Sequence, residues 1–217
     1  MTVLPLASEA DATAVYEQVR AHLDVSGLIA YPTETVYGLG SKARDDDLMR
    51  LARLKGRPPK KPFLLLVNGR TMAESCGLVF TPHAAAMAHE LWPGPLTLVL
   101  SGGEGKLPDG LRGSEGGIAI RWTSHKAVSR LITMLGEPIT STSANKPGGP
   151  TAPGVGAIVN AFGPAVERGE LLILDGGVLG NVPPSTLVDC TTMEPRMIRE
   201  GAIPRDELRR RVGSYAP

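Results

Sequence analysis

Four cationic side chains lie close together in the segment Lys55-Gly56-Arg57-Pro58-Pro59-Lys60-Lys61. Like charges this close repel one another unless an anion or solvent separates them. An ammonium group and a planar guanidinium on either side of a glycine can together hold phosphate oxygens, because glycine lets the backbone approach a ligand closely. The segment predicts a phosphate-binding loop in which Lys55 and Arg57 contact the phosphate. Taken alone, the segment is explained slightly better as a solvated surface loop, so the choice between the two interpretations depends on other segments.

A second polar cluster, Thr140 to Lys146 (TSTSANK), stands where a predicted strand ends. In open α/β sheets, ligands bind at loops that leave the carboxyl ends of strands. The hydroxyl groups and the carboxamide of this cluster can hydrogen-bond phosphate and ribose oxygens, although such residues before Pro and Gly are also typical of an ordinary turn. Ser143 and Lys146 match the SxxK pattern of penicillin-binding enzymes, but the partner motifs of those enzymes are absent, so we interpret this match as chance.

The third segment, Tyr31 to Gly40 (YPTETVYGLG), places hydroxyl side chains between two tyrosines and ends in glycines. Such a loop can hold a small polar ligand by hydrogen bonds from its hydroxyl groups. The alternative is a plain connection between a strand and a helix, with the two tyrosines packed on the core.

Helices and strands alternate between these segments. Apolar positions with a 3.6-residue period predict a first helix that Ser8 caps and Gly27 ends. Further helices are predicted over residues 48–55, 81–91, 125–135 and 155–162. Strands are predicted over residues 28–31, 63–67, 96–100, 117–121, 139–142, 171–174, 186–190 and 196–199, and residues 33–40 are predicted to form a loop.

This alternation indicates the α/β class, with a central sheet flanked by helices. Because the last strands follow one another without helices between them, we expect a mixed open sheet rather than a purely parallel one. We expect one domain over residues 1–205 and a short C-terminal tail over residues 206–217 that forms an exposed helix.

Composition and charge exclude several classes of protein. The formal net charge of +1 provides no overall field to attract a polyanion, so any phosphate must be bound by local clusters. The chain lacks a signal peptide's basic start and any apolar run of the roughly 20 residues that a membrane helix needs, which predicts a cytoplasmic protein without membrane contact. Cys76, Cys190 and the four histidines show no metal-binding spacing. The sequence motifs of P-loop nucleotide-binding proteins, dinucleotide-binding proteins and serine hydrolases are absent, so any ATP must be bound by a different kind of site.

Seven segments, taken in order, resemble the YrdC-like family of threonylcarbamoyl-AMP synthases. They are Tyr31 to Gly40, Lys55 to Pro58 (KGRP), Pro93 to Thr97 (PGPLT), Arg121 after Gly117 to Ile120, Ser143 to Asn145 (SAN), Ser185 to Asp189 (STLVD) and Ile198 to Gly201 (IREG). The resemblance extends from about Gly27 to Gly201. One such match is weak evidence, but seven in the same order are highly specific.

The resemblance implies a twisted, YrdC-like α/β fold with a deep basic cavity. It implies that L-threonine, bicarbonate and ATP, with Mg2+, are converted to threonylcarbamoyl-AMP and pyrophosphate. Partner threonylcarbamoyl transferase proteins would then pass the group to an adenosine of tRNAs that read ANN codons. The ATP site implied by similarity consists of Lys55, Arg57, Ser143 and Asn145, lined further by Thr97 and Arg199. The threonine site consists of Thr33, Arg121 and Ser185. Lys55 and Arg57 would stabilise the negative charge of the adenylation step.

At two places the sequence departs from the family pattern, so the resemblance does not define the edges of this pocket. Trp122-Thr123 follows Arg121, and Lys146-Pro147-Gly148 follows Asn145 in place of a serine-glycine pair. Two other functions therefore stay open: an RNA-binding translation accessory factor that holds tRNA or double-stranded RNA, and a related carbamoyl- or acyl-adenylating enzyme. Near-neutral charge and few aromatic residues argue against the first. On the premise of an exposed loop, we also expect Lys55→Ala and Arg57→Ala to leave the fold intact.

Overall fold

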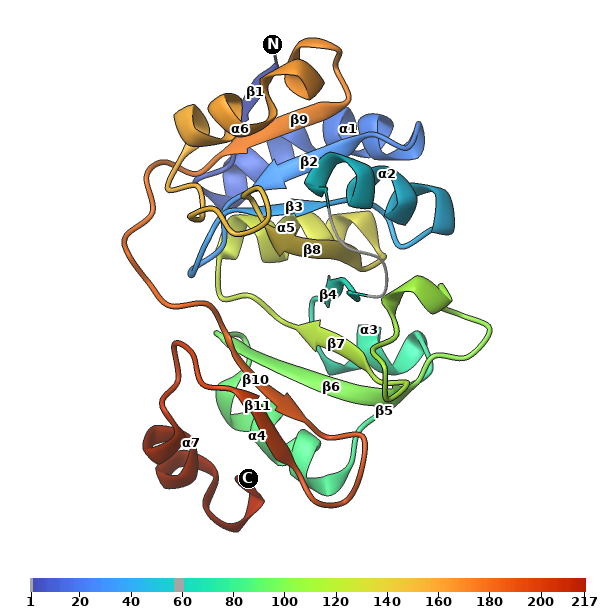
Figure 1. The fold of residues 1–217 in the computed structure, drawn as a ribbon, viewed down its shortest axis with the longest axis vertical. Coiled ribbons are helices and arrows are strands. Elements are labelled where there is room, and N and C mark those ends of the chain that lie inside the picture. Colours follow the sequence, from blue (N-terminus) through green and yellow to red (C-terminus); the bar gives the residue numbers. More distant parts are fainter. Residues whose placement is uncertain (1, 57–60) are drawn as a thin grey trace.

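The computed structural model describes residues 2–56 and 61–217, and eleven strands within these ranges join in one twisted sheet (Figure 1). The strand order is β1-β9-β2-β3-β8-β4-β7-β6-β10-β11, with β5 paired to β6 beside this path. The strands are β1 (Val3–Pro5), β2 (Leu28–Tyr31), β3 (Gly38–Gly40), β4 (Leu64–Leu66), β5 (Leu78–Val79), β6 (Leu96–Gly102), β7 (Ile118–Arg121), β8 (Ile139–Ser143), β9 (Leu171–Asp175), β10 (Thr186–Asp189) and β11 (Arg196–Arg199).

Helices flank this sheet. They are α1 (Glu9–Asp24), α2 (Asp45–Lys55), α3 (Arg70–Ser75), α4 (Pro82–Leu91), α5 (Lys126–Leu135), α6 (Val155–Glu167) and α7 (Arg205–Val212), with short 3-10 helices at Asp109–Leu111 and Gly213–Tyr215. No helix in the described ranges has both the length and the apolar character needed to cross a membrane.

Parallel and antiparallel pairs are mixed throughout the sheet. β9 pairs in parallel with β1 and β2, and β6 pairs in parallel with β10. β3 and β8 are antiparallel to each other and to their outer neighbours, β2 and β4. β9 inserts between β1, at one edge of the sheet, and β2, while β10 and β11 form an antiparallel pair at the opposite edge. The predicted α/β class and mixed open sheet are confirmed.

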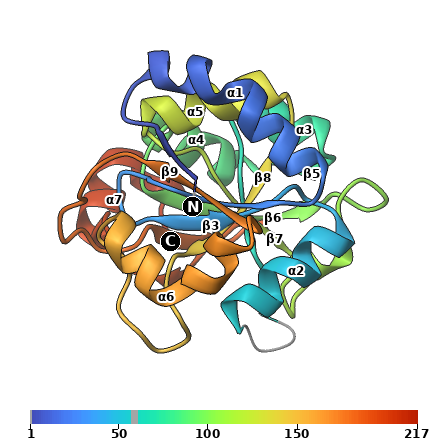
Figure 2. The same cartoon turned by 90° about the horizontal axis from the view of Figure 1, so that it is seen from above.

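Helices cover both faces of the sheet, which explains why strand β2 is buried along its whole length. In β2, Leu28 and Ala30 pack into one hydrophobic core, whereas the intervening Ile29 and Tyr31 pack into the other. α1 and α5 cover the second core, and α2 and α6 lie on the opposite side (Figure 2). A strand that is buried on both faces carries a continuous apolar run instead of an alternating one.

Residues 38–40 form strand β3 rather than the predicted loop. β3 lies between β2 and β8, and its glycines make this close approach possible: a Cβ at Gly40 would clash with the carbonyl oxygen of Thr140 and lie 2.9 Å from the Tyr31 ring. The Tyr31 hydroxyl donates to the same carbonyl oxygen at 3.0 Å. A three-residue strand with two glycines has neither the length nor the side chains that a sequence pattern can detect.

The first helix begins as predicted but ends earlier. The Ser8 side chain accepts a hydrogen bond from the Asp11 amide at 3.2 Å, and the Asp11 carboxylate accepts one from the Ser8 amide at 2.8 Å, which makes a capping box. α1 ends at Asp24, and Ser26 adopts a left-handed φ of 62° before Gly27 is reached. Gly27 instead makes room for the His22 ring, with which a Cβ would clash.

Several short elements were not predicted because no apolar period is long enough to reveal them. These are β1, α3 and β5. α6 also extends beyond the predicted end at Phe162 and contains Pro164. A proline inside a helix removes a hydrogen bond and clashes with the preceding turn, and here the helix bends at Phe162, whose φ is −132°.

The C-terminal helix α7 packs against α4 and is not an exposed helix as predicted. Leu208 is fully buried and Val212 is 8% exposed, and these two residues, four positions apart, form an apolar stripe on one side of the helix. The Arg211 guanidinium donates to the Glu90 carbonyl oxygen of α4 at 2.7 Å. The division at residue 205 stays a prediction, but α7 shares the hydrophobic core of the preceding residues.

Truncating Leu208 tests whether α7 is part of the folded core. We predict that Leu208→Ala lowers the free energy of unfolding by roughly 2–4 kcal/mol, because a fully buried leucine leaves a cavity. Urea denaturation followed by circular dichroism measures this loss. Arg210→Ala, on the exposed side of the same helix, is the control and should change the value by less than about 0.5 kcal/mol. If Leu208→Ala lowers the free energy of unfolding no more than the control does, α7 does not contribute to the folded core.

Candidate active site

The predicted site residues lie where regular elements end. Lys55 is the last residue of α2, Ser143 of β8, Arg121 of β7 and Arg199 of β11, and Ser185 directly precedes β10. Side chains at such positions are held by the sheet but point into the loops beyond it. They form two groups, one around Lys55 and one around Arg121.

The first group joins the end of α2 to the end of β8. The Lys55 ammonium donates to the Ser143 carbonyl oxygen and to Asn145 Oδ1, both at 2.5 Å. Ser143 Oγ donates to the same Oδ1 at 2.6 Å, and Asn145 Nδ2 donates to the Gly149 carbonyl oxygen at 2.6 Å. The structure therefore brings together three of the four residues expected to form the core of the ATP site. The fourth, Arg57, lies outside the described residues.

Lys55 is buried, so the premise of an exposed loop was wrong for this residue. Only 5% of Lys55 is exposed. Gly56 follows it with a left-handed φ of 62° and ends α2, so the ammonium belongs to the negative end of the helix dipole. Lys55 consequently supports the fold as well as the site.

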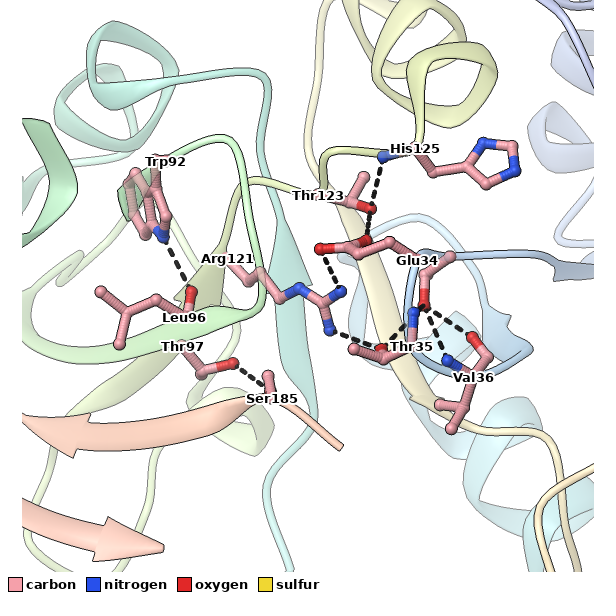
Figure 3. A network of polar contacts seen from close by, with 11 residues as sticks. Glu34, Thr35, Val36, Trp92, Leu96, Thr97, Arg121, Thr123, His125 and Ser185 are labelled. Atoms are coloured by element: carbon pink, nitrogen blue, oxygen red, sulfur yellow. Dashed lines mark hydrogen bonds and ion pairs between the residues drawn. The ribbon is translucent and has the colours of Figure 1, made fainter. Parts of the chain in front are cut away.

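The second group is centred on Arg121, which is 5% exposed and faces the 33–36 loop (Figure 3). Its Nη1 donates to Thr35 Oγ1 at 3.1 Å, and its Nη2 lies 2.7 Å from Glu34 Oε1. The Nη2 contact is an ion pair without hydrogen-bond alignment: within the described residues, neither Nη2 nor Nε of Arg121 makes a hydrogen bond, and neither does Glu34 Oε1. The guanidinium thus keeps hydrogen-bonding capacity on one edge.

Glu34 and Thr35 were not identified as site residues from the sequence, although both lie in the YPTETVYGLG segment. Glu34 Oε2 accepts a short hydrogen bond from the hydroxyl of Thr123, which is fully buried. Burial acts to raise the pKa of Glu34, but the Arg121 charge and the Thr123 hydroxyl outweigh it, so the pKa lies below its ordinary value. Thr123, at a departure from the family pattern, is therefore part of the network that keeps Glu34 ionised.

On the other side of Arg121, three strands contribute polar groups. Thr97 and Ser185 share a hydrogen bond of 2.7 Å between their hydroxyl oxygens, and Thr97 is the β6 residue paired with Arg121 of β7. Arg199 donates from Nη2 to the Ser185 carbonyl oxygen at 2.8 Å. Partial desolvation and then the charge of Arg121 lower the pKa of the Arg199 guanidinium. Two guanidinium groups beside one carboxylate leave a local positive excess that favours an anion.

Thr33 shapes the loop from within. Its hydroxyl accepts hydrogen bonds from the amides of Thr35 and Val36, at 3.2 and 3.1 Å, and donates to the Val36 carbonyl oxygen at 2.6 Å. Only 3% of Thr33 is exposed. The hydroxyl is thus engaged in its own turn, and its contact with a threonine ligand stays a prediction.

A cavity of about 720 Å³ is lined by one residue from each group. Thr35, from the Arg121 group, and Asn145, from the Lys55 group, both line it, together with α6 residues and the 179–182 segment. Its volume lies within the range of about 300–1,000 Å³ that small-molecule sites occupy. Lys146, at the second departure from the family pattern, also lines the cavity and donates to the Leu54 carbonyl oxygen at 3.2 Å.

Comparison with known proteins shows which family combines this fold with this site. The Sua5/YciO/YrdC family model, described as "Telomere recombination", matches residues 22–201. The chain belongs to the Sua5/YciO/YrdC family. The matched range contains every predicted site residue from Thr33 to Arg199, so the family resemblance and the fold expected from the sequence are confirmed.

Two relatives and one solved structure of this family define the extent of the similarity. A threonylcarbamoyl-AMP synthase of Thiobacillus denitrificans is 35% identical over 80% of this chain and 90% of its own length. A threonylcarbamoyl-AMP synthase of Pyrococcus abyssi is 33% identical over 86% of this chain, which spans only 54% of that longer protein. The crystal structure of P. abyssi Sua5 complexed with L-threonine matches 98% of this chain and 61% of its own, with a TM-score of 0.84 and 28% identity.

The buried ammonium of Lys55 can be tested by its effect on stability. We predict that Lys55→Met lowers the free energy of unfolding by roughly 1–3 kcal/mol, because the Ser143 carbonyl oxygen loses a buried donor. Lys126→Met, at an exposed position of α5, is the control and should have little effect. Equal urea midpoints for the two variants would contradict a structural role of Lys55.

The Arg121–Glu34 ion pair predicts a dependence of stability on pH. Because folding lowers the pKa of Glu34 below its ordinary value of 4.5, the pair stabilises the protein fully above that value, and this stabilisation is lost as the pH falls through and below it. We therefore expect the free energy of unfolding of Glu34→Gln to fall less steeply than that of the wild type between about pH 5.5 and 3.5. Urea unfolding at a series of pH values measures both slopes, and parallel curves would contradict the prediction.

Proposed function

We propose that this chain is an L-threonylcarbamoyladenylate synthase, which forms threonylcarbamoyl-AMP and pyrophosphate from L-threonine, bicarbonate and ATP. One observation carries the proposal: Asn145, which accepts a hydrogen bond from Lys55, and Thr35, which accepts one from Arg121, line the same cavity. Phosphate chemistry and recognition of an amino-acid carboxylate are thereby combined in one site. The names of the relatives agree with this activity.

At the amino-acid end, Arg121 is proposed to bind the carboxylate of L-threonine. Nε and Nη2 form one edge of the guanidinium, where Nη2 has an ion-pair contact with Glu34 but neither nitrogen makes a hydrogen bond within the described residues, and such an edge binds a carboxylate by two parallel hydrogen bonds. Ser185 and Thr33 would complete this end, Ser185 through its hydroxyl and Thr33 by shaping the loop. The bound L-threonine of P. abyssi Sua5 supports this assignment by similarity.

At the nucleotide end, Lys55, Arg57, Ser143 and Asn145 are proposed to hold ATP, with Thr97 and Arg199 lining the site. The amine of threonine and bicarbonate form a carbamate with loss of water. A carbamate oxygen then attacks the α-phosphorus, and the bond from that phosphorus to the oxygen bridging to the β-phosphorus breaks, so pyrophosphate leaves. Negative charge gathers on the phosphorus oxygens in this step, and the cations of Lys55 and Arg57 would stabilise it without forming a covalent intermediate.

Mg2+ is proposed to enter with ATP rather than on a site of its own. Across residues 2–56 and 61–217, no group of three or more His, Cys, Asp or Glu side chains is arranged to hold a metal ion. The described residues proposed for the nucleotide end carry no carboxylate, which Mg2+ prefers, so phosphate oxygens would be its ligands. Bound in this way, Mg2+ neutralises charge on the leaving pyrophosphate.

The product is proposed to pass to threonylcarbamoyl transferase proteins that modify an adenosine of tRNA. A mixed anhydride of a carbamate and a phosphate is reactive towards water and amines, so direct transfer to a partner protects it. A cytoplasmic location, where ATP and tRNA are found, accompanies this proposal.

Pyrophosphate release from ATP tests the proposed function. The purified protein, with Mg2+ and bicarbonate, should release pyrophosphate with L-threonine and release far less with L-serine, L-valine or no amino acid. Arg121→Met should abolish threonine-dependent release, because the carboxylate loses its charged partner. Release that does not depend on threonine would favour a related acyl-adenylating enzyme, and ATP binding without release would favour an RNA-binding role.

A further inference from the structure

We infer that Glu34 is a specificity-determining residue whose carboxylate accepts hydrogen bonds from the ammonium group of the amino acid bound by Arg121. The inference rests on the proposed function, since it extends the proposed threonine site. It assigns to the site a preference for α-amino acids over carboxylic acids that lack the amine.

The geometry of an α-amino acid requires a carboxylate at this place. The amine nitrogen is separated from the carboxyl carbon by only about 2.5 Å. An amino acid whose carboxylate binds Arg121 therefore brings its ammonium within a few ångströms of the same guanidinium. Glu34 Oε1 lies 2.7 Å from Nη2 of that guanidinium (Figure 3). Without Glu34, the ammonium would meet only the positive charges of Arg121 and Arg199.

The hydrogen-bond inventory of the pair is complementary to a zwitterion. In the described part of the chain, Arg121 has two nitrogens without a hydrogen bond, and Glu34 has one oxygen, Oε1, without one. A carboxylate needs donors and an ammonium needs an acceptor. Oε1 and Nη2 are both buried and form one ion-pair contact without hydrogen-bond alignment. A bound amino acid would replace this contact with hydrogen bonds from Arg121 to its carboxylate and from its ammonium to Glu34.

The rest of Glu34 is fixed in advance. Oε2 accepts from the Thr123 hydroxyl, and Thr123 Oγ1 in turn accepts from the His125 amide at 3.2 Å. The Glu34 side chain as a whole retains 20% exposure, but Oε1 itself is buried against Nη2 of Arg121, so a ligand reaches Oε1 by displacing that contact. One oxygen fixed by a hydrogen bond and the other held only by a charge contact is a binding group that is already oriented.

The same carboxylate directs the carbamate. Once the amine has become a carbamate nitrogen, one N–H remains to donate to Glu34. The new carboxylate carries a negative charge, which the Glu34 charge repels. Glu34 thereby sets the direction in which the carbamate oxygens point, away from itself.

Binding of L-threonine and of its 2-hydroxy analogue, in which a hydroxyl replaces the ammonium, tests the inference by isothermal titration calorimetry. We expect the wild type to bind L-threonine about 10- to 100-fold more tightly than the analogue, as for hydrogen bonds between charged groups. Glu34→Gln should reduce this ratio to below about threefold, because the neutral amide loses the charge while keeping the shape. Glu170→Gln, an exposed carboxylate outside the site, is the control and should keep the wild-type ratio.

The ratio separates recognition from a structural effect, since a general loss of site integrity weakens both ligands equally. An unchanged ratio in Glu34→Gln, or equal binding of both ligands by the wild type, overturns the role of Glu34 and leaves the proposed function standing. A wild type that binds no L-threonine overturns both. If Glu34→Gln binds neither ligand, Glu34→Asp, which keeps the charge, must retain the preference for threonine, and its loss there also overturns the inference.

Discussion

The close packing of β3 between β2 and β8 sets the position of both halves of the site. Gly38 pairs with Tyr31 on one side and with Ser143 on the other, so the 33–36 loop connects two paired residues, one of which is also paired with the last residue of β8. A side chain at Gly40 would not fit, because the Tyr31 ring and the Thr140 carbonyl oxygen occupy that space, and one at Gly38 would contact the Tyr31 ring tightly. The loop that carries Glu34 and Thr35 therefore projects from two paired strands, which limits its freedom to move away from Arg121.

Local charge, rather than the charge of the whole chain, makes the site suitable for anions. The chain as a whole carries a formal charge of only +1. Lys55 and Arg121 are each 5% exposed, and burial strengthens their interactions with a ligand compared with the same groups in water. Buried cations are costly unless they find partners. Here Lys55 donates to the Ser143 carbonyl oxygen and to Asn145, and Arg121 donates to Thr35 and is ion-paired with Glu34. These partners hold the cations in place before a substrate arrives.

Membership of the family does not by itself define the pocket of this chain, because two segments of the pocket differ from the family pattern. The residues expected at the ATP and threonine sites lie in the region shared with the Sua5/YciO/YrdC family. The two departures from the family pattern have identifiable consequences. Thr123 holds Glu34, and Lys146 extends across to the end of α2 and lies 4.6 Å from the centre of the Phe162 ring. The first departure therefore acts on the carboxylate beside Arg121, and the second lines the cavity.

The sequence by itself determined the α/β class, the main helices and strands, and the types of residue that are proposed to bind phosphate and carboxylate groups, because periodicity and local motifs are read along the chain. Only the tertiary structure decided that Lys55 is buried, that Thr33 hydrogen-bonds its own turn, that residues 38–40 form a strand and that α7 packs on α4. It also decided that Glu34 meets Arg121 and Thr123. These residues lie far apart in the sequence, and the contact between them depends on strand order and register. Register is fixed by the packing of all the strands together, which no local pattern contains.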